Sequence, residues 1–249
     1  FAALLRVWTE AFPTVYHAWH PAVAGLAIAT MVGGNAIGLA QRNIKRMLAY
    51  SSIAHAGYLL VGLVANNQLG SAAFLFYILA YTLATMGAFG VVIAVGEPGE
   101  RHQQLADFAG LWSVRPWLAG AMAVFMLALL GFPLAGGMGF FAKWYVLQAA
   151  LSATHPETAL AVVLVLTSVV SAGYYLAVVM MMFMRPRPAN APALRPVRAP
   201  TFVVIYASAI VLLFFGIFPA GFVGLARLSV PNIVASSAAS PPVTSLARR

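Results

Sequence analysis

The sequence predicts an all-α, polytopic membrane helix bundle with about six whole transmembrane helices, a truncated one at the N-terminus and one broken helix. Composition is the first reason: 62% of the 249 residues are hydrophobic and 8% are charged, whereas soluble domains carry about 25% charged residues. The second reason is the presence of several long uncharged runs, each close to the roughly 20 apolar residues that a bilayer core requires.

The elements follow from these runs in order. Residues 1–8 are typical of the tail of a severed span, so we expect the chain to be a fragment of a longer protein. The uncharged runs that predict whole spans lie at about 21–40, 47–65, 71–95, 158–183 and 201–218, the last one with an extension towards 228. In domain terms, we expect a transmembrane unit over 1–183, a basic proline-rich loop over 184–200, a final transmembrane helix over 201–230 and a mobile tail over 231–249.

The hydrophobic region at 116–151 predicts the broken helix. At about 1.5 Å per residue it is too long for one straight crossing of a ~30 Å core. Its middle reads GFPLAGGMGFF at 131–141, where Pro133 removes a backbone donor and four glycines weaken the helix. Because lipid cannot satisfy the freed backbone groups, the break must be buried in protein or hydrated.

The net charge of +9 reflects loop residues and predicts orientation. The basic residues gather in the loops at 41–46, 97–115 and 185–200, which fall on one side if the broken region crosses once. Such loops are typically cytoplasmic, and this pattern argues against nucleic acid binding. The absence of cysteine excludes disulfides, iron–sulfur ligation and thiol catalysis on this chain.

Lys143 is the first candidate functional residue. It lies about eight residues before the end of its helix near Leu151, or roughly 12 Å, which is close to the middle of a ~30 Å core. Ionisable residues at that depth usually face a polar interior and mark ion pathways. The break should also place a new helix N-terminus near Met138, one turn before the lysine. The alternative interpretation is a lysine that snorkels to the interface.

His55 is the second candidate, because it lies at a similar depth about ten residues after Lys45. Histidine exchanges protons near physiological pH and suits a proton relay; the alternative is a packing histidine bonded to a neighbouring hydroxyl. Other polar residues within the spans we interpret mainly as interhelical contacts: Asn35, Tyr81, Thr82, Thr85, Ser168, Ser171, Tyr174 and Tyr175.

The ionisable residues near the ends of the spans give little indication of a functional site. His17 and His20 form an i,i+3 pair without an evident third ligand, so we predict no metal site. Glu10 and Glu157 lie at the ends of spans, where we expect them to be solvated.

Two segments carry a family resemblance. QRNIKRMLAYSSIAHAGYLLVGL at 41–63 resembles subunit N of proton-pumping NADH:quinone oxidoreductase, respiratory complex I. The broken region at 108–151 resembles the family's broken helix, where an apolar run and a GxP break precede GFxxKFY; here the last motif reads GFFAKWY at 139–145. The sister subunit M usually has a glutamate at the position of Lys143, and the sister subunit L usually has an aspartate after the lysine.

The resemblance implies the second inverted repeat of an antiporter-like subunit, followed by a final helix. By resemblance, Lys143 ends the proton path and His55 lies on its hydrated axis, while the family's other relay residues belong to a preceding repeat. The protein would then sit in the bacterial inner membrane with other complex I subunits, its sister subunits among them. It would carry protons and water and hold no cofactor itself: NADH, FMN, iron–sulfur clusters and quinone would bind elsewhere.

Two alternatives stay open. A subunit of a multisubunit sodium/proton antiporter would share the fold and the break. A structural membrane scaffold would not explain why the chain bears the free-energy cost of a lysine, Lys143, within the membrane.

Overall fold

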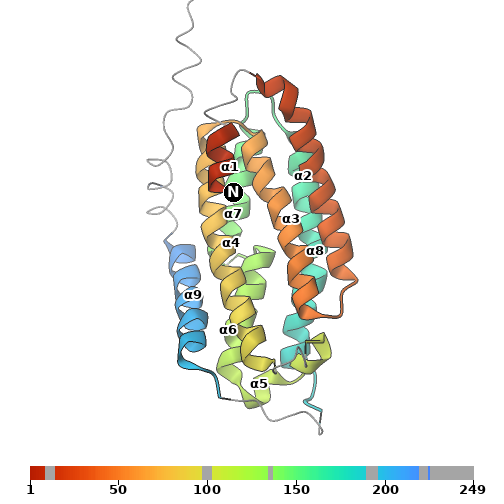
Figure 1. Ribbon diagram of the computed structural model, residues 1–249, viewed down its shortest axis with the longest axis vertical. Coiled ribbons are helices and arrows are strands. Elements are labelled where there is room, and N and C mark those ends of the chain that lie inside the picture. The colour runs from red at the N-terminus through yellow and green to blue at the C-terminus, as the bar shows by residue number, and fades with distance from the viewer. Residues whose placement is uncertain (9–14, 97–102, 134–136, 189–195, 219–223, 225–249) are drawn as a thin grey trace, which may run out of the picture.

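The computed structural model describes residues 1–8, 15–96, 103–133, 137–188, 196–218 and 224, which form a bundle of roughly antiparallel helices (Figure 1). The α-helices of this described part are α1 Ala2–Arg6, α2 Tyr16–Leu39, α3 Ile44–Val64, α4 Gln68–Val95, α5 Leu111–Val114, α6 Pro116–Leu130, α7 Met138–Leu151, α8 Thr158–Met184 and α9 Ala199–Ile217. A short 3-10 turn at Leu105–Phe108 precedes α5.

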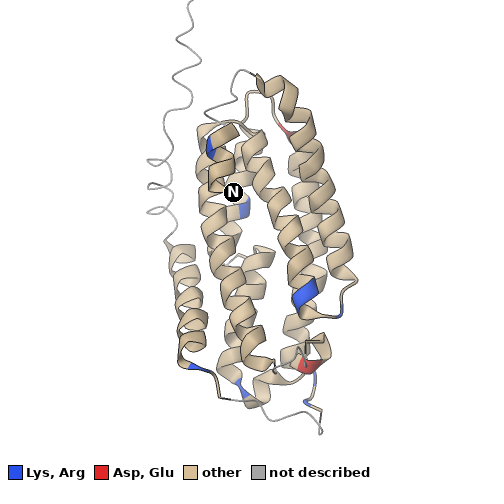
Figure 2. Ribbon diagram, viewed as in Figure 1, with Lys and Arg blue, Asp and Glu red and all other residues tan. Residues whose placement is uncertain are grey.

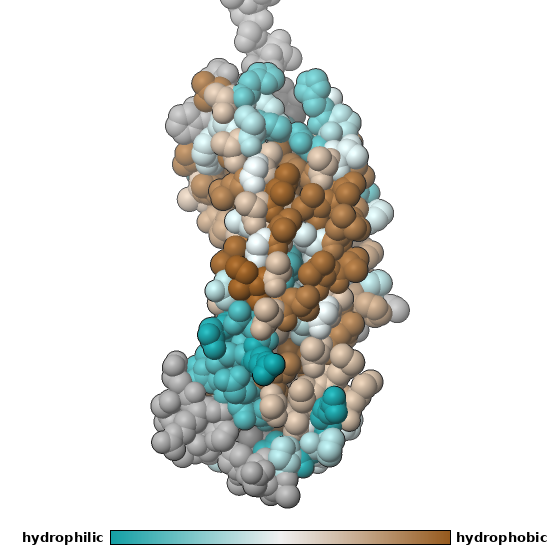
Figure 3. All heavy atoms as spheres, turned by 90° about the vertical axis from the view of Figure 1, so that its right-hand side faces the viewer, coloured by the Kyte–Doolittle hydropathy of each residue, from teal (hydrophilic) through white to brown (hydrophobic). Residues whose placement is uncertain are grey.

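The predicted membrane helix bundle is confirmed. Five helices are long and apolar enough to cross a membrane, namely α2, α3, α4, α8 and α9. The sixth crossing is the predicted broken helix, which consists of α6 and α7. Apolar side chains cover the middle of the face shown in Figure 3, with hydrophilic side chains towards both ends, as expected of a bundle that spans a bilayer.

The helix bounds depart most from the predicted ones in the first and last whole spans. The first whole span was predicted to begin at Pro21, but α2 begins at Tyr16 and Pro21 lies inside it. Proline usually marks a helix start, but Pro21 is the sixth residue of α2, where it removes one intrahelical hydrogen bond. The last helix ends at Ile217. The predicted extension to 230, apart from residue 224, and the tail at 231–249 lie outside the described residues.

Local sequence sets the turns that align the inner helices. The side chain of Asn43 accepts hydrogen bonds from the backbone of Lys45 and Arg46 and so caps α3. Asn67 caps α4 through Gly70, and its amide also donates to the carbonyl of Ala149 at 2.9 Å. This last bond places the end of α7 beside the turn between α3 and α4. The broken helix therefore runs from one end of the bundle to the other once, as the sequence predicts.

The described basic residues gather mostly at one end of the bundle, where α3, α6 and α9 begin (Figure 2). Arg115 and Arg198 are the N-cap residues of α6 and α9, and Arg185 follows the last residue of α8. Within the bundle, α3 is the most buried of the five long helices and α9 the least. The core therefore surrounds α3, which carries His55.

Candidate functional site

The break between α6 and α7 satisfies much of its own backbone. Gly131 ends α6 in the left-handed conformation with φ 78°, which favours glycine. Its N–H donates to the carbonyl of Ala128 at 3.0 Å, and the N–H of Phe132 donates to the carbonyl of Leu127 at 3.0 Å. These are the two bonds of a Schellman motif. The pattern leaves the carbonyl of Leu130, the last residue of α6, available for another donor.

Glycines allow the two half-helices and α9 to meet at the break. A Cβ at Gly139 in α7 would lie 1.9 Å from the carbonyl oxygen of Ala128 in α6, so only glycine permits this approach. Gly137, just before α7, has a positive φ of 45°, and a Cβ on Gly216 of α9 would lie 2.2 Å from the Cα of Gly137. The break is therefore packed against protein on the α9 side, as the cost of exposing backbone to lipid requires.

Lys143 reaches back from α7 to the end of α6. Its side chain is 8% exposed, and its Nζ donates a hydrogen bond to the carbonyl of Leu130 at 2.9 Å. Gly131 makes room for this path, because a Cβ there would lie 2.9 Å from Cδ of Lys143. The predicted lysine at the break is thus bound to a backbone group that the break itself exposes.

Neutral groups surround the ammonium of Lys143. Its Nζ lies 4.8 Å from the ring centroid of Tyr58, a cation–π contact. The described carboxylates are engaged elsewhere: Glu157 contacts His20 at 2.6 Å, and Asp107 accepts from the backbone of Gln104 at 2.8 Å. Within the described residues, the carbonyl dipole of Leu130 and the aromatic face of Tyr58 stabilise the ammonium of Lys143, and no carboxylate pairs with it.

His55 forms hydrogen bonds through both ring nitrogens. It is 3% exposed. Its Nδ1 lies 2.9 Å from the hydroxyl of Tyr77 on α4, and its Nε2 lies 3.0 Å from the hydroxyl of Tyr175 on α8. The ring stacks on Tyr81 with centroids 4.9 Å apart. Because a neutral imidazole donates through one nitrogen and accepts through the other, this arrangement offers a proton both an entry and an exit.

Two chains of polar side chains extend from the centre of the bundle. In one, Tyr175 bonds both His55 and Ser51. In the other, Tyr174 donates to Asn35 at 2.8 Å, and Asn35 donates to the hydroxyl of Tyr58 at 3.0 Å. These bonds join α2, α3 and α8, as expected of interhelical contacts. Since Tyr175 also touches His55, its hydroxyl contacts a candidate relay residue directly.

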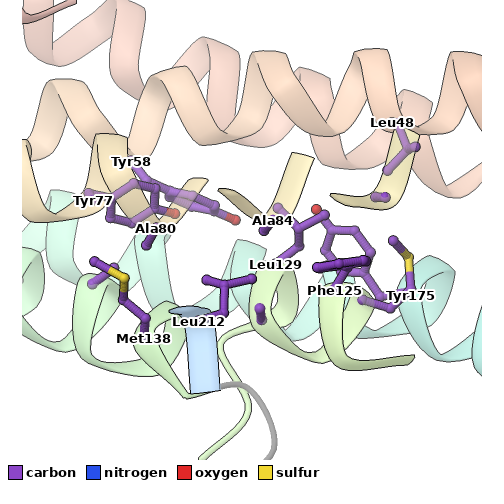
Figure 4. Packing of buried hydrophobic residues seen from close by; sticks show 14 of the residues in the cluster. Leu48, Tyr58, Tyr77, Ala80, Ala84, Phe125, Leu129, Met138, Tyr175 and Leu212 are labelled. Atoms are coloured by element: carbon purple, nitrogen blue, oxygen red, sulfur yellow. The ribbon is translucent and has the colours of Figure 1, made fainter. Parts of the chain in front are cut away.

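Tyr58 lies between the two candidate residues. Its ring contacts His55 with centroids 5.4 Å apart, and its face carries the ammonium of Lys143. Tyr77 lies beside it, with ring centroids 6.4 Å apart (Figure 4). The sequence interpretation assigned no role to Tyr58 or Tyr77. A signal for Tyr77 existed, because it lies four residues before Tyr81 and therefore on the same face of α4.

Two spaces adjoin the candidate residues. A space of about 10 Å³ beside His55 is also lined by Tyr77, Tyr81, Leu129 and Gly139, and so reaches the break. That volume is close to the minimum for one water molecule. A wider groove of about 450 Å³ runs between α7 and α8 along Lys143 and is mostly apolar.

The expectation that Glu157 is simply solvated is wrong. His20 on α2 and Glu157 at the start of α8 form a hydrogen bond with Nε2–Oε1 of 2.6 Å, and their side chains are 25% and 16% exposed. The two residues are 137 positions apart, so only the packing of α2 on α8 could reveal the pair. Among the described residues, no three His, Cys, Asp or Glu side chains lie close enough to hold a metal ion. Glu10 lies outside the described part.

Comparisons with known proteins identify the family. The chain is 52% identical over 243 residues to NADH-quinone oxidoreductase subunit N of Gemmatimonas aurantiaca, which covers 97% of this chain and 46% of that protein. It is 50% identical over 184 residues to subunit N of Chloroflexus aggregans, covering 74% and 37%. The chain thus spans about half the length of the curated relatives it matches.

Solved structures give the same fold. A chain of respiratory complex I from Thermus thermophilus with bound aureothin is 36% identical, with a TM-score of 0.70 over 82% of this chain and 45% of that one. A chain of the Mrp complex from a Dietzia species has a TM-score of 0.77 over 90% and 49%, but at 21% identity it shows only a shared fold. The model of the NADH:quinone oxidoreductase/Mrp antiporter transmembrane family matches residues 2–171, and the chain belongs to that family.

Proposed function

We propose that this chain is the proton-conducting part of subunit N of a proton-translocating NADH:quinone oxidoreductase, with Lys143 and His55 as relay residues. The observation that carries the proposal is the setting of Lys143. A buried lysine lies at a helix break, bound to a free carbonyl and an aromatic face. The relatives at 50% and 52% identity are named subunit N, which favours this assignment within the family.

The neutral surroundings of Lys143 suit a group that gains and loses a proton. A lysine clamped by a carboxylate would leave a buried, unpaired anion whenever it lost its proton, and such an anion is costly. The partners of Lys143, the carbonyl of Leu130 and the ring of Tyr58, carry no net charge in either state. The lysine can therefore lose its proton without stranding an opposite charge.

His55 supplies the second proton-exchanging position. Its two nitrogens contact hydroxyls from different helices, α4 and α8, and the small space beside it extends to Gly139 at the break. Protons would pass between His55 and Lys143 through water in this region. A change of charge on a neighbouring lysine of the full-length protein would drive Lys143 to release its proton towards one face.

The wider assignment completes the proposal. The protein would reside in the bacterial inner membrane, with the basic end of the bundle cytoplasmic because basic loops stay on that side. It would assemble with other membrane subunits of complex I, including the sister antiporter-like subunits, and contact lipid. NADH, FMN, iron–sulfur clusters and quinone would bind other subunits, so that this chain has no redox site.

The test uses the full-length subunit in its assembled membrane enzyme. Lys143→Ala should lower the number of protons moved per NADH oxidised, measured in sealed vesicles with a pH-sensitive dye, while assembly stays intact. Lys45→Ala is the matched control, because Lys45 lies in the first turn of α3 at the basic end of the bundle. An unchanged ratio of protons to electrons in Lys143→Ala would refute the role of this lysine.

The second candidate is a subunit of a multisubunit sodium/proton antiporter. The name of the matching family includes Mrp antiporters, and the Mrp complex shares the fold. Sodium-dependent proton flux without NADH, in vesicles that carry the full-length protein, would favour it over the first proposal. A structural scaffold predicts no effect of Lys143→Ala in either assay.

A further inference from the structure

We propose that Tyr58 is a positioning residue whose aromatic face, rather than its hydroxyl, holds the ammonium of Lys143 at the helix break. The inference rests on the proposed function and adds a residue to it. Tyr58 is 1% exposed and lies one turn after His55 on α3. Its ring centroid is 4.8 Å from Nζ of Lys143, and its ring is nearly perpendicular to that of His55, at an interplanar angle of 83°.

The hydroxyl of Tyr58 is directed to a different partner. It accepts a hydrogen bond from the amide of Asn35 at 3.0 Å, and Asn35 in turn accepts from the hydroxyl of Tyr174 at 2.8 Å. Asn35 is itself fixed by a bond to the carbonyl of Met31 at 2.7 Å. The Asn35 contact thus ties the ring to α2 and α8, while the face of the ring remains available to Lys143.

The ring matters because Lys143 has few partners. The described contacts of its ammonium are one carbonyl and this ring. A lysine has three N–H donors, so one hydrogen bond leaves most of its charge to be stabilised by the surroundings. A desolvated cation is attracted to the negative face of an aromatic ring. Without the ring, the flexible side chain can turn into the groove between α7 and α8, which Lys143 also lines.

Substitutions separate the ring from the hydroxyl. Tyr58→Phe keeps the aromatic face and removes the bond to Asn35, whereas Tyr58→Leu removes the face and keeps an apolar side chain. Removing the aromatic face should lower the equilibrium population of the state in which the ammonium of Lys143 lies beside the carbonyl of Leu130. The expected decrease is roughly five- to thirtyfold, which corresponds to the free energy of a desolvated cation–π contact. Phe74→Leu is the matched control, because Phe74 is fully buried in the same core and its recorded ring contact is with Phe1.

The measurement is protons moved per NADH oxidised in sealed vesicles, with the full-length subunit in its assembled enzyme. We expect Tyr58→Phe to retain most of the wild-type ratio, and Tyr58→Leu to lose at least about half of it, because the occupancy change is several-fold. Phe74→Leu should retain the ratio. Equal loss in Tyr58→Phe and Tyr58→Leu would overturn the role of the face in favour of the hydroxyl. Equal loss in Phe74→Leu would assign the effect to packing.

The Lys143→Ala variant, measured alongside, keeps the two proposals distinguishable. If Lys143→Ala lowers the ratio and Tyr58→Leu does not, the inference about Tyr58 fails and the proposed function stands. If Lys143→Ala leaves the ratio unchanged, the proposed function fails, and Tyr58 has no proton-carrying partner to position.

Discussion

Replacing Gly139 with alanine should pull the two halves of the broken helix apart. A Cβ at this position would lie 1.9 Å from the carbonyl oxygen of Ala128 and 2.7 Å from its carbonyl carbon. Ordinary contact begins at 3.4 Å, so the start of α7 must move by about 1.5 Å relative to the end of α6. Both atoms in the clash belong to the backbone, so no side-chain rotation can relieve it.

The displacement acts directly on the lysine. Lys143 lies one turn after Gly139 on the same helix, and its Nζ is 2.9 Å from the carbonyl of Leu130 at the end of α6. A rigid shift of 1.5 Å along this line would lengthen the distance to about 4.4 Å, beyond hydrogen-bonding range. We expect a stability cost of about 1–3 kcal/mol, typical of an overpacked interior, together with a lower ratio of protons moved to NADH oxidised.

The assay compares Gly139→Ala with Gly120→Ala in the assembled enzyme, in sealed vesicles with a pH-sensitive dye. Gly120 lies in α6, and a Cβ there meets nothing within 4 Å. It therefore adds the same methyl group to the same broken helix without a clash. The reasoning is refuted if both variants pump protons equally well and unfold at the same temperature.

Two other substitutions test the surroundings of the break and of the histidine. Gly216→Ala would place a Cβ 2.2 Å from the Cα of Gly137, so we expect a loss of thermal stability of the purified assembly, again about 1–3 kcal/mol; an unchanged unfolding temperature would contradict the close packing of α9. Tyr77→Phe removes the hydroxyl at Nδ1 of His55 and leaves a buried nitrogen without its partner, at a cost of about 1–3 kcal/mol. Proton pumping should fall in Tyr77→Phe and not in Tyr206→Phe on the peripheral helix α9, and equal pumping in the two would show that this hydroxyl is dispensable.

Much of the fold could be predicted from one-dimensional features. Apolar runs fixed the spans to within a few residues, because span length follows bilayer thickness. The Pro133 and glycine pattern located the break, and counting residues from helix ends placed Lys143 and His55 in the interior, where both are nearly fully buried. Each of these inferences depends on a single helix and its neighbouring turns.

The contacts between helices could not be predicted in this way. The cation–π contact of Lys143 with Tyr58 depends on how α7 crosses α3, and the pair of His20 with Glu157 depends on how α2 meets α8. Hydrophobic periodicity gives little guidance on these rotations, because the lipid-facing and protein-facing sides of such helices are both apolar. The contacts that these side chains make with the candidate residues therefore emerged only from the packing.

The hydrogen bonds of His55 have a consequence for the timing of the proposed proton relay. A neutral imidazole accepts through one nitrogen, so one of the hydroxyls of Tyr77 and Tyr175 must point its hydrogen at the ring. A protonated ring donates through both nitrogens, and that hydroxyl must then turn away. In the proposed relay, each proton that passed would leave the hydrogen bonds pointing the opposite way, and they would have to turn back before the next one. The rotation of a buried tyrosine hydroxyl would then be a reset step of the proposed relay, required before the path could be used again.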